Sequence, residues 1–363
     1  MSNLQLSGNK LMWHLEKLVE WQKGKDIYPL HIDLGPSSAC NQNCRFCYVG
    51  YLGKEKPVFL GKDVFLKLMR DLGRLKVESV ALCGTGEPFL NKATPEAILT
   101  AKKAGVDVAV ITNGVFFSPK IAEKVLGSLT WIRFSVYGDS QKVYDWVHRG
   151  GKYDWVKVNI NILKAVEIKR KNNYPTTLGA VVILLPENGH EMPSLAKKLR
   201  EYGLDYMVIK PPSQNPRNKL SIPRDLAKRF SAEIKEAEGF NSENFRMEVR
   251  RDLFAHEESL NGEDSPEATK PYEKCLGLPF IACIDADGSV YACNGFWRSS
   301  EFLYGNLYQN SFEEIWKSNR RKRVMDFIKN KLELSQCEPF CRHNSINIFL
   351  WDLANPPRHI NFP

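Results

Sequence analysis

The hydrophobic positions of the chain alternate between short apolar runs and stretches with helical spacing. Apolar runs of strand length occupy residues 31–34, 79–83, 107–112, 131–136, 177–184 and 206–209. Between them lie the stretches 62–75, 95–104, 119–126, 155–171 and 193–202, where apolar residues recur every three or four positions. Strands that alternate with helices of this length predict an α/β fold built from right-handed β-α-β units with a parallel sheet. The pattern alone does not decide between an open doubly wound sheet and a partial barrel.

Two kinds of segment flank this alternation. Before the first strand, apolar residues recur at helical spacing and predict an N-terminal helix that contains Leu11, Met12, Leu15, Leu18 and Val19. After residue 215 the alternation stops at prolines, and a charged helical segment at 224–238 precedes a polar loop at 261–266. We therefore predict an N-terminal helix within 1–28, a β-α domain at 29–215, a helical linker at 216–270 and a C-terminal domain at 271–363.

The composition indicates a protein without a membrane segment. The longest nearly unbroken apolar run, at 178–185, is far shorter than the roughly 18 residues that span a bilayer. The first ten residues contain no basic stretch leading into a long apolar run, so we expect no secretory signal. The nine cysteines are grouped, which favours metal binding in a reducing compartment over a disulfide framework. We expect a cytoplasmic protein.

The chain is basic, with 51 Lys and Arg against 42 Asp and Glu, and a net charge of +9. This balance fits an anionic substrate, a nucleotide or simply a basic protein. The densest basic run, at 320–323, lies between apolar residues at helical spacing. It is typical of the solvated face of an amphipathic helix rather than of a nucleic-acid site, so we expect no nucleic-acid partner.

Three cysteines occupy one short loop directly after the first predicted strand. Cys40, Cys44 and Cys47 have the spacing C-x3-C-x2-C. Three thiolates can hold a cubane iron–sulfur cluster by three of its four irons, which leaves the fourth iron open. Structural zinc and accidental spacing are the alternatives, although structural zinc normally has four ligands in paired units and no second pair lies nearby.

With Phe46 in the aromatic position, the loop resembles the C-x3-C-x-aromatic-C motif that defines the radical S-adenosylmethionine (radical SAM) enzymes. The resemblance implies a partial (β/α)6 TIM barrel, a 4Fe-4S cluster on the three cysteines, and S-adenosylmethionine bound at the open iron. It also implies a reductant such as flavodoxin or ferredoxin. The cofactor is then cleaved to a 5′-deoxyadenosyl radical that abstracts hydrogen from the substrate.

Further segments at the predicted strand ends are similar to cofactor contacts of the same family. Gly84, Gly86 and Glu87 resemble its Gly-Gly-Glu motif, with Thr85 in place of a glycine. The resemblance implies that the cofactor is contacted by Phe46, Gly84, Gly86, Glu87, Asn113, Ser135 and Arg149. Tyr137 stands where the family commonly has an aspartate. The plain alternatives are a strand-to-helix turn for the glycines, an ordinary Asn-Gly turn and a surface ion pair for Arg149.

A second set of four cysteines lies in the C-terminal part of the chain. It consists of Cys275, Cys293, Cys337 and Cys341, and residues 284–291 between the first two read as a hairpin with an Asp-Gly turn. On spacing alone, either structural zinc or an iron–sulfur cluster fits. The segment resembles the Twitch version of the auxiliary-cluster domain that follows many radical SAM barrels. This resemblance implies a small α+β domain with one auxiliary 4Fe-4S cluster on the four thiols.

Three other residues are assigned from their place in the pattern. Cys83 and Cys283 lie outside both sets, and small buried packing residues are the plain interpretation of both. Some radical SAM epimerases donate a hydrogen atom from a cysteine thiol, and Cys283 is the candidate for that role. Lys210 ends the sixth predicted strand, and we expect it to contact an anionic group of the substrate.

Two reaction outcomes follow from the resemblance, dehydrogenation with an auxiliary cluster as electron acceptor and epimerisation with a thiol donor. Because only about 30 residues precede the first strand, no N-terminal peptide-recognition domain is expected, which favours a small sugar-like or nucleotide-linked substrate. A peptide-modifying epimerase or crosslinking maturase is the alternative enzyme. An iron–sulfur electron carrier and a zinc-stabilised nucleic-acid binder are the alternatives without catalysis.

Overall fold

A single ten-stranded sheet forms the centre of the protein in the computed structural model, which describes residues 8–52, 56–213, 223, 225–254, 270–338 and 341–361. Its strand order is β10-β9-β8-β1-β2-β3-β4-β5-β6-β7. From β8 to β7 all neighbours are parallel, whereas β8, β9 and β10 pair in antiparallel fashion. The strands are β1 (His31–Leu34), β2 (Ser79–Leu82), β3 (Asp107–Thr112), β4 (Trp131–Ser135), β5 (Thr177–Ile183), β6 (Tyr206–Lys210), β7 (Arg246–Val249), β8 (Ile281–Ile284), β9 (Ser289–Tyr291) and β10 (Leu303–Asn306).

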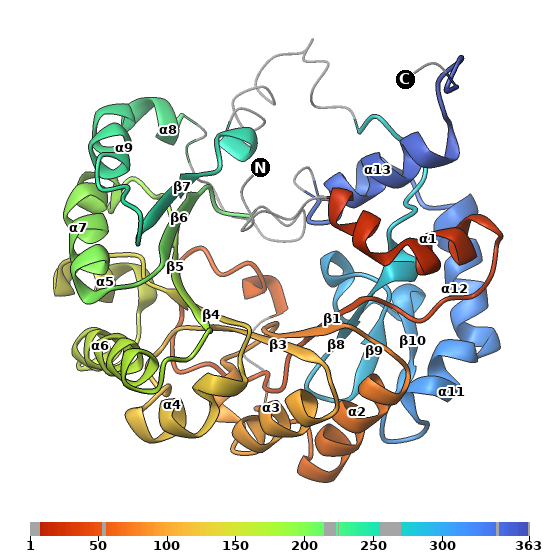
Figure 1. The fold of residues 1–363 in the computed structure, drawn as a ribbon, viewed down its shortest axis with the longest axis horizontal. Helices are drawn as coiled ribbons and strands as arrows, with labels where there is room; N and C mark the ends of the chain where they lie inside the picture. The colour runs from red at the N-terminus through yellow and green to blue at the C-terminus, as the bar shows by residue number, and fades with distance from the viewer. Residues whose placement is uncertain are drawn as a thin grey trace.

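Figure 1 shows that the sheet curves into a partial barrel with the helices on its outer side. The described α-helices and the N-terminal 3-10 helix η1 include η1 (Gly8–His14), α1 (Leu15–Gln22), α2 (Lys62–Arg74), α3 (Thr94–Lys103), α4 (Pro119–Val125), α5 (Gln141–His148), α6 (Asp154–Asn172), α7 (Met192–Tyr202), α8 (Leu226–Arg229), α9 (Ser231–Glu238), α11 (Phe312–Lys317), α12 (Asn319–Asn330) and α13 (Asn344–Ala354), and short 3-10 helices lie between them. Each predicted barrel helix and strand is present within two residues of its predicted ends. The predicted partial barrel is confirmed.

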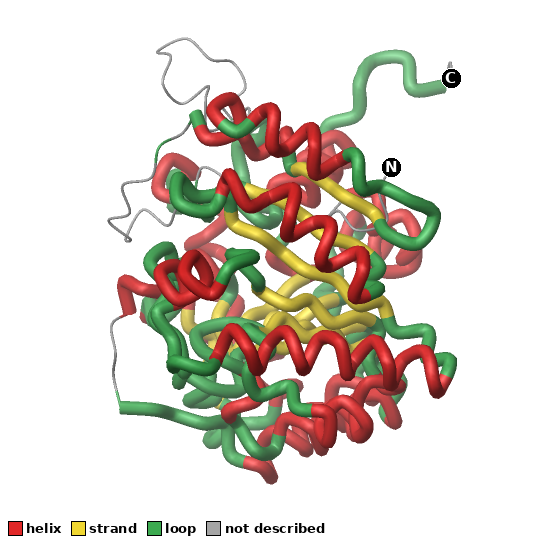
Figure 2. The backbone as a smooth tube through the Cα atoms, turned by 90° about the vertical axis from the view of Figure 1, so that its left-hand side faces the viewer, coloured by secondary structure: helices red, strands yellow, loops and turns green. Residues whose placement is uncertain are grey.

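The alternation of side chains along the strands separates an outer core from the barrel interior. On β4, Ile132 and Phe134 are completely buried, whereas Trp131, Arg133 and Ser135 between them are half-buried. Successive side chains of a strand point to opposite faces, so the apolar pair packs toward the helices and the other three face inward. Figure 2, viewed from the side, shows the strands inside a layer of helices.

The elements that were not predicted include helix α5 and strand β7. Helix α5 has only eight residues, and β7 has four and lies within the segment expected to be a helical linker. Strand β7 has the sequence Arg-Met-Glu-Val, with charged residues at two of its four positions, so it contains no apolar run. The polar loop expected at 261–266 lies outside the described residues. The N-terminal helix is present, but it begins as the 3-10 turn η1 and leaves Met12, Leu15 and Val19 exposed.

The C-terminal segment continues the sheet of the barrel. Strand β8 pairs in parallel with β1, and the register places Cys283 opposite Asp33. Leu11 and Leu18 from η1 and α1 pack in one apolar cluster with Phe280 and with Leu350 from α13. The first and last parts of the chain therefore close the same side of the molecule. No helix in the described ranges is long and apolar enough to cross a membrane.

The basic run at 320–323 lies on helix α12, as predicted. One member, Arg321, is buried rather than solvated: its Nη1 donates to Asp26 Oδ1 at 2.7 Å. Its guanidinium also lies 3.9 Å from the centre of the Trp316 ring. The other three residues of the run are exposed.

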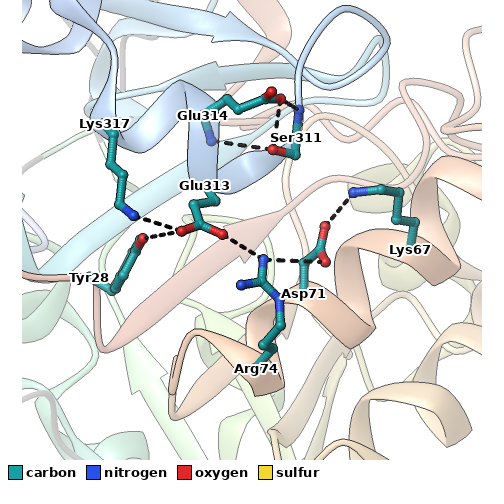
Figure 3. Close-up of polar contacts among 8 residues, drawn as sticks. All are labelled: Tyr28, Lys67, Asp71, Arg74, Ser311, Glu313, Glu314 and Lys317. Carbon is teal, nitrogen blue, oxygen red and sulfur yellow. Dashed lines mark hydrogen bonds and ion pairs between the residues drawn. The ribbon is translucent and has the colours of Figure 1, made fainter.

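A polar network joins helix α11 to helix α2 (Figure 3). The carboxylate of Glu313 accepts hydrogen bonds from Lys317 Nζ at 2.7 Å and Tyr28 OH at 3.2 Å. It also forms an ion pair of 2.7 Å with Arg74, which lies 3.7 Å from Asp71. The network therefore links the C-terminal segment to the barrel through surface charges.

We predict that Glu313→Gln lowers the thermal unfolding temperature slightly at pH 7, because ion pairs at an exposed surface contribute little to stability. Hydrogen bonds from Lys317 and Arg74 lower the pKa of Glu313 from its ordinary 4.5 to about 2. The stabilisation is therefore complete above pH 4.5 and is lost as the pH falls towards 2. Calorimetry from pH 7 to pH 3 should show the difference from wild type shrinking.

Glu123→Gln, at an exposed position of α4, is the control and should leave the unfolding temperature unchanged. An equal loss in this control, or a Glu313→Gln deficit that does not shrink at low pH, contradicts the role of the network.

Candidate active site

The loop with the first three cysteines follows β1 at the carboxyl edge of the parallel strands, as predicted. Backbone hydrogen bonds fix its flanks: Ser38 N donates to Val58 O at 2.9 Å and Leu60 N to Pro36 O at 3.0 Å. Within the loop, Cys47 N donates to Cys44 O at 3.2 Å. In α/β barrels this edge, where the loops after successive strands meet, is where ligands bind. The three thiols therefore lie at the functional edge of the barrel.

The last turn of helix α5 contacts the cysteine loop. Asn43 N donates to His148 O at 3.0 Å, and Arg45 N donates to Val147 O at 3.2 Å. Arg45 Nε donates to Trp146 O at 3.1 Å, and its guanidinium stacks 3.7 Å from the Trp146 ring centre. The final carbonyls of a helix have no partner within the helix. Here the loop supplies those partners.

His148 is the buried centre of this contact, and the sequence analysis did not assign it a role. Its Nε2 accepts from the backbone N–H of Tyr137 at 3.2 Å, so the ring proton is on Nδ1. Nδ1 lies 2.8 Å from Gln42 Oε1 and 3.7 Å from Cys44 Sγ. Burial lowers the pKa of His148 to about 3, so the ring is neutral. Gln42 in turn donates to Tyr144 OH at 2.9 Å.

The predicted glycine turn packs directly against the cysteine loop. A Cβ added to Gly86 would lie 2.3 Å from Ala39 O and 2.5 Å from Ser37 O. Gly84 has a φ of +123°, and a Cβ there would lie 2.9 Å from Gly35 Cα. Only glycine allows these two loops to approach so closely. The structure therefore explains both glycines by contact between the loops.

Glu87 and Asn113 lie together behind the cysteine loop. Glu87 is buried, and its carboxylate accepts from the Thr112 hydroxyl at 2.7 Å and from Asn113 N at 2.9 Å. Asn113 Nδ2 donates to Asn41 Oδ1 at 2.8 Å and lies 3.8 Å from Cys40 Sγ. These contacts make Glu87 a positioning residue for Asn113. Asn113 in turn positions the start of the cysteine loop.

The other predicted cofactor contacts also surround this loop. Phe46 is buried and meets the Tyr137 ring edge-on at 4.8 Å. Ser135 ends β4 and is half-buried. Tyr137, which replaces the common aspartate, stacks on His148 at 4.7 Å. Arg149 caps α5 with a left-handed φ of 51° and has an exposed side chain.

The barrel interior contains a buried ion pair that the sequence analysis missed. Arg342 from the C-terminal segment pairs with Asp33 on β1, and His31 Nε2 lies 3.1 Å from Asp33 Oδ1. Burial alone would raise the pKa of Asp33, but Arg342 and His31 hold it well below its ordinary range. An acidic residue within an apolar strand was the only sequence signal for this pair.

The two remaining cysteines flank Asp33 on neighbouring strands. Cys283 on β8 is completely buried and packs with Tyr291 and Trp297. Cys83 follows β2, is half-buried, and lies with its Sγ 3.7 Å from Asp33 Oδ1. Of the two thiols, the more accessible is therefore Cys83, which the sequence analysis treats as a packing residue.

The second cysteine set is gathered around β9 and the segment before α13. Burial, Cys341 and Cys275 raise the pKa of Cys293, and burial and Cys275 raise that of Cys341 to about 12. Gly295 N donates to Cys293 Sγ at 3.4 Å, and Asn347 Nδ2 donates to Cys275 Sγ at 3.6 Å. In the described ranges, no three His, Cys, Asp or Glu side chains lie close enough together to hold a single metal ion.

Both thiol sets have the chemistry that an iron–sulfur cluster needs. In the N-terminal set, burial together with Cys40 and Cys47 raises the pKa of Cys44. Adjacent thiolates are therefore unfavourable without a cation, and bound iron supplies that cation. The N–H groups directed at Cys40, Cys275 and Cys293 can donate to thiolate sulfur. The residues present fit clusters at both places.

Two family models match the chain. The radical SAM superfamily model matches residues 34–199, and the model of an iron–sulfur cluster-binding domain, SPASM, matches residues 275–343. The first range holds the cysteine triplet and the second holds the four-cysteine set. The second match favours the iron–sulfur interpretation of that set over zinc.

Curated relatives extend over most of the chain. The mycofactocin maturase MftC of Mycolicibacterium smegmatis is 25% identical over 85% of this chain and 75% of that protein. The Fe-coproporphyrin III synthase of Methanosarcina barkeri is 22% identical over 81% of this chain and 75% of that protein. An S-adenosylmethionine-dependent nucleotide dehydratase of Lacinutrix mariniflava is 30% identical, but over only 27% of this chain and 21% of that protein.

A solved structure shares the fold. The crystal structure of Streptococcus suis SuiB bound to S-adenosylmethionine matches with a TM-score of 0.65 and 14% identity. The match covers 93% of this chain and 78% of that chain. The likeness extends from the barrel into the C-terminal segment.

We predict that His148→Phe destabilises the cysteine loop while leaving the second cysteine set intact. Phenylalanine keeps the ring between Tyr137 and Tyr144 but leaves the Tyr137 N–H and Gln42 Oε1 without their partner, at a cost of about 1–3 kcal/mol. Iron content after reconstitution and the electron paramagnetic resonance spectrum of the reduced protein measure the effect. We expect less iron and an altered signal from the N-terminal set.

The exposed His190 provides the matched control. His190→Phe should keep both the iron content and the spectrum. Wild-type iron, spectrum and unfolding temperature in His148→Phe would show that the histidine does not support the loop.

Proposed function

Because the chain is a radical SAM enzyme with a C-terminal SPASM-like cluster domain, we propose that it abstracts a hydrogen atom from a small, polar, anionic substrate in the barrel interior. When bound, S-adenosylmethionine and the reduced 4Fe-4S cluster supply a 5′-deoxyadenosyl radical for that step. The observation that carries the proposal is the cysteine loop, held by three neighbouring segments at the open edge of a barrel with a charged interior.

We assign the cofactors to the two thiol sets. Cys40, Cys44 and Cys47 hold the cluster that binds S-adenosylmethionine, and Cys275, Cys293, Cys337 and Cys341 hold the auxiliary cluster. The residues predicted to contact the cofactor fall into two groups according to their neighbours in the structure. Gly84, Gly86, Glu87 and Asn113 position the cysteine loop through the contacts described above, and Ser135 and Arg149 remain the candidates for direct contact with the cofactor.

The charged interior supports a sugar-like or nucleotide-linked anionic substrate. Lys210 ends β6 on the same face as Tyr206, which points into the barrel. Burial and the nearby Arg133, Arg250 and Arg342 lower the pKa of Lys210 to about 8. An anionic group beside it offsets this concentration of positive charge.

Dehydrogenation is the outcome that we favour. It removes one hydrogen atom to the adenosyl radical and then one electron and one proton from the substrate, and an auxiliary cluster is a suitable electron acceptor. Epimerisation instead requires a thiol that reaches the substrate radical. Cys283, the candidate donor, is completely buried behind Tyr291 and Trp297. A flavodoxin or ferredoxin supplies the electron that starts each turnover.

A peptide-modifying maturase is the second candidate. The similarity to MftC over 85% of this chain favours it, since that protein is a maturase. The two candidates share the cofactors and differ in the substrate. The mass of the purified product distinguishes the two candidates. Dehydrogenation lowers the mass of a small molecule by two hydrogens, whereas a maturase changes a peptide.

We predict that the anaerobically reconstituted protein forms 5′-deoxyadenosine from S-adenosylmethionine and a strong reductant. Two cubane clusters require about eight irons per chain. Replacing Cys40, Cys44 and Cys47 by Ala should remove 5′-deoxyadenosine formation and leave about four irons, because the auxiliary set is independent. Chromatography and iron analysis measure both quantities. Zinc instead of iron, or loss of all iron in the triple variant, contradicts the assignment.

We predict that binding of the substrate weakens as the pH rises through about 8, where the free enzyme's Lys210 loses its charge. The KM for substrate should increase from pH 7 to pH 9 in the wild type. Lys210→Met should raise KM about tenfold at pH 7 and remove this increase. Lys228→Met, on the exposed surface of α8, is the charge-matched control. A Lys210→Met profile parallel to wild type excludes the lysine from substrate binding.

A further inference from the structure

Four cationic side chains influence one region of the barrel interior, and only two of them have acidic partners. Arg342 pairs with Asp33, and Arg250 pairs with Asp252 at 2.6 Å. Arg133 and Lys210 form no ion pair with any carboxylate in the part of the chain that the structure describes. Two of the four cations therefore have no carboxylate within ion-pair distance among the described residues, and the buried Glu248 on β7 acts on Arg250.

Arg133 is held in place by an aromatic contact rather than by an acid. Its Nε donates to Tyr206 OH at 3.1 Å. Its guanidinium lies 5.1 Å from the centre of the Trp131 ring and 5.7 Å from that of Tyr206. The terminal Nη groups have no hydrogen-bond acceptor among the described residues. The side chain is thus fixed through one nitrogen while its forked end stays available.

A glycine on the intervening strand makes this arrangement possible. The register places Gly179 on β5 directly between Arg133 on β4 and Tyr206 on β6. A Cβ on Gly179 would lie 2.1 Å from the Tyr206 ring. The missing side chain lets the ring lie across β5 and reach Arg133 on the far side. Three adjacent strands therefore cooperate to position one guanidinium.

Lys210 supplies the second unpartnered charge on the same inner face. It lies four residues beyond Tyr206 on β6, paired with Ile183 of β5, and its Nζ makes no hydrogen bond within the described ranges. Arg133 contributes to lowering the pKa of Lys210, and it also acts on Tyr137 beside the cysteine loop. Arg133 is thus within electrostatic reach of both Lys210 and the cysteine loop.

We propose that Arg133 and Lys210 form a receptor for a carboxylate or phosphate group of the substrate, with Tyr206 as the positioning residue. The forked guanidinium binds the oxygens of such a group in pairs, and the ammonium adds a point charge. The assignment rests on the proposed function, since it places the substrate within the barrel interior. It narrows the substrate class to molecules with an anionic group that lies near strands β4 to β6 when the substrate is bound.

The first test measures anion binding without catalysis. The reconstituted holoenzyme is titrated with inorganic phosphate or acetate at constant ionic strength, and its unfolding temperature is followed. Bound anion should raise the wild-type value by a few degrees. Arg133→Met and Lys210→Met should lose most of this rise, and Tyr206→Phe part of it. Arg200→Met, on the exposed surface of α7, removes the same charge and should respond like wild type.

The iron content of each variant checks that it has folded. No rise in the wild type with either anion, or an equal rise in Arg133→Met and Lys210→Met, overturns the receptor. This test does not require cleavage of S-adenosylmethionine. A failure of the receptor proposal can therefore be distinguished from a failure of the proposed function, which would appear as an absence of 5′-deoxyadenosine.

The second test identifies the anionic group. Small molecules from the source organism are separated by anion exchange at pH 7, and each fraction is assayed for stimulation of 5′-deoxyadenosine formation. The stimulating fraction should be retained by the resin, and Arg133→Met should need at least about ten times more of it. Sensitivity to phosphatase indicates a phosphate ester and resistance indicates a carboxylate. Stimulation by the unretained fraction overturns the proposal.

Discussion

The candidate active site depends on the close packing of the cysteine loop against its neighbours. Three thiols can share a cluster only when the backbone that carries them is fixed. Gly86 lets the next loop touch the backbone at Ala39, Asn113 ties down Asn41, and His148 contacts Gln42 and Cys44. Each contact comes from the end of a different strand or helix. The barrel therefore places the ends of these strands and helices at one edge, next to the cysteine loop.

The continuous sheet gives the C-terminal segment a second role. Because β8 pairs with β1, Arg342 reaches Asp33 in the barrel interior instead of solvent. The segment that carries the second thiol set thus also sets the charge around the substrate region. Arg342 pairs with Asp33, whereas Arg133 and Lys210 form no ion pair with a described carboxylate. The electrostatics of the interior and the position of the second thiol set have the same structural origin.

The sequence predicted the barrel strands and helices closely because apolar runs alternate with stretches of helical spacing along this part of the chain. It also placed both thiol sets, since cysteine spacing is visible along the chain. Contacts that depend on the register between strands could not be predicted. The role of Gly179 can be recognised only when Arg133 and Tyr206 are known to be its neighbours on the adjacent strands. His148 preceded a recognised turn, but its contact with Gln42 joins residues 106 positions apart. Helix α5 was not predicted, although it supports the loop.

The central claim is that the cluster on Cys40, Cys44 and Cys47 has one open iron that binds S-adenosylmethionine. Mössbauer spectroscopy of the protein reconstituted with ⁵⁷Fe tests it most directly. On addition of S-adenosylmethionine, one iron in about eight should change its isomer shift, because only one iron of the N-terminal cluster would lack a cysteine ligand. The spectrum of the variant without the three cysteines should not change. A wild-type spectrum that is identical with and without S-adenosylmethionine would contradict the account.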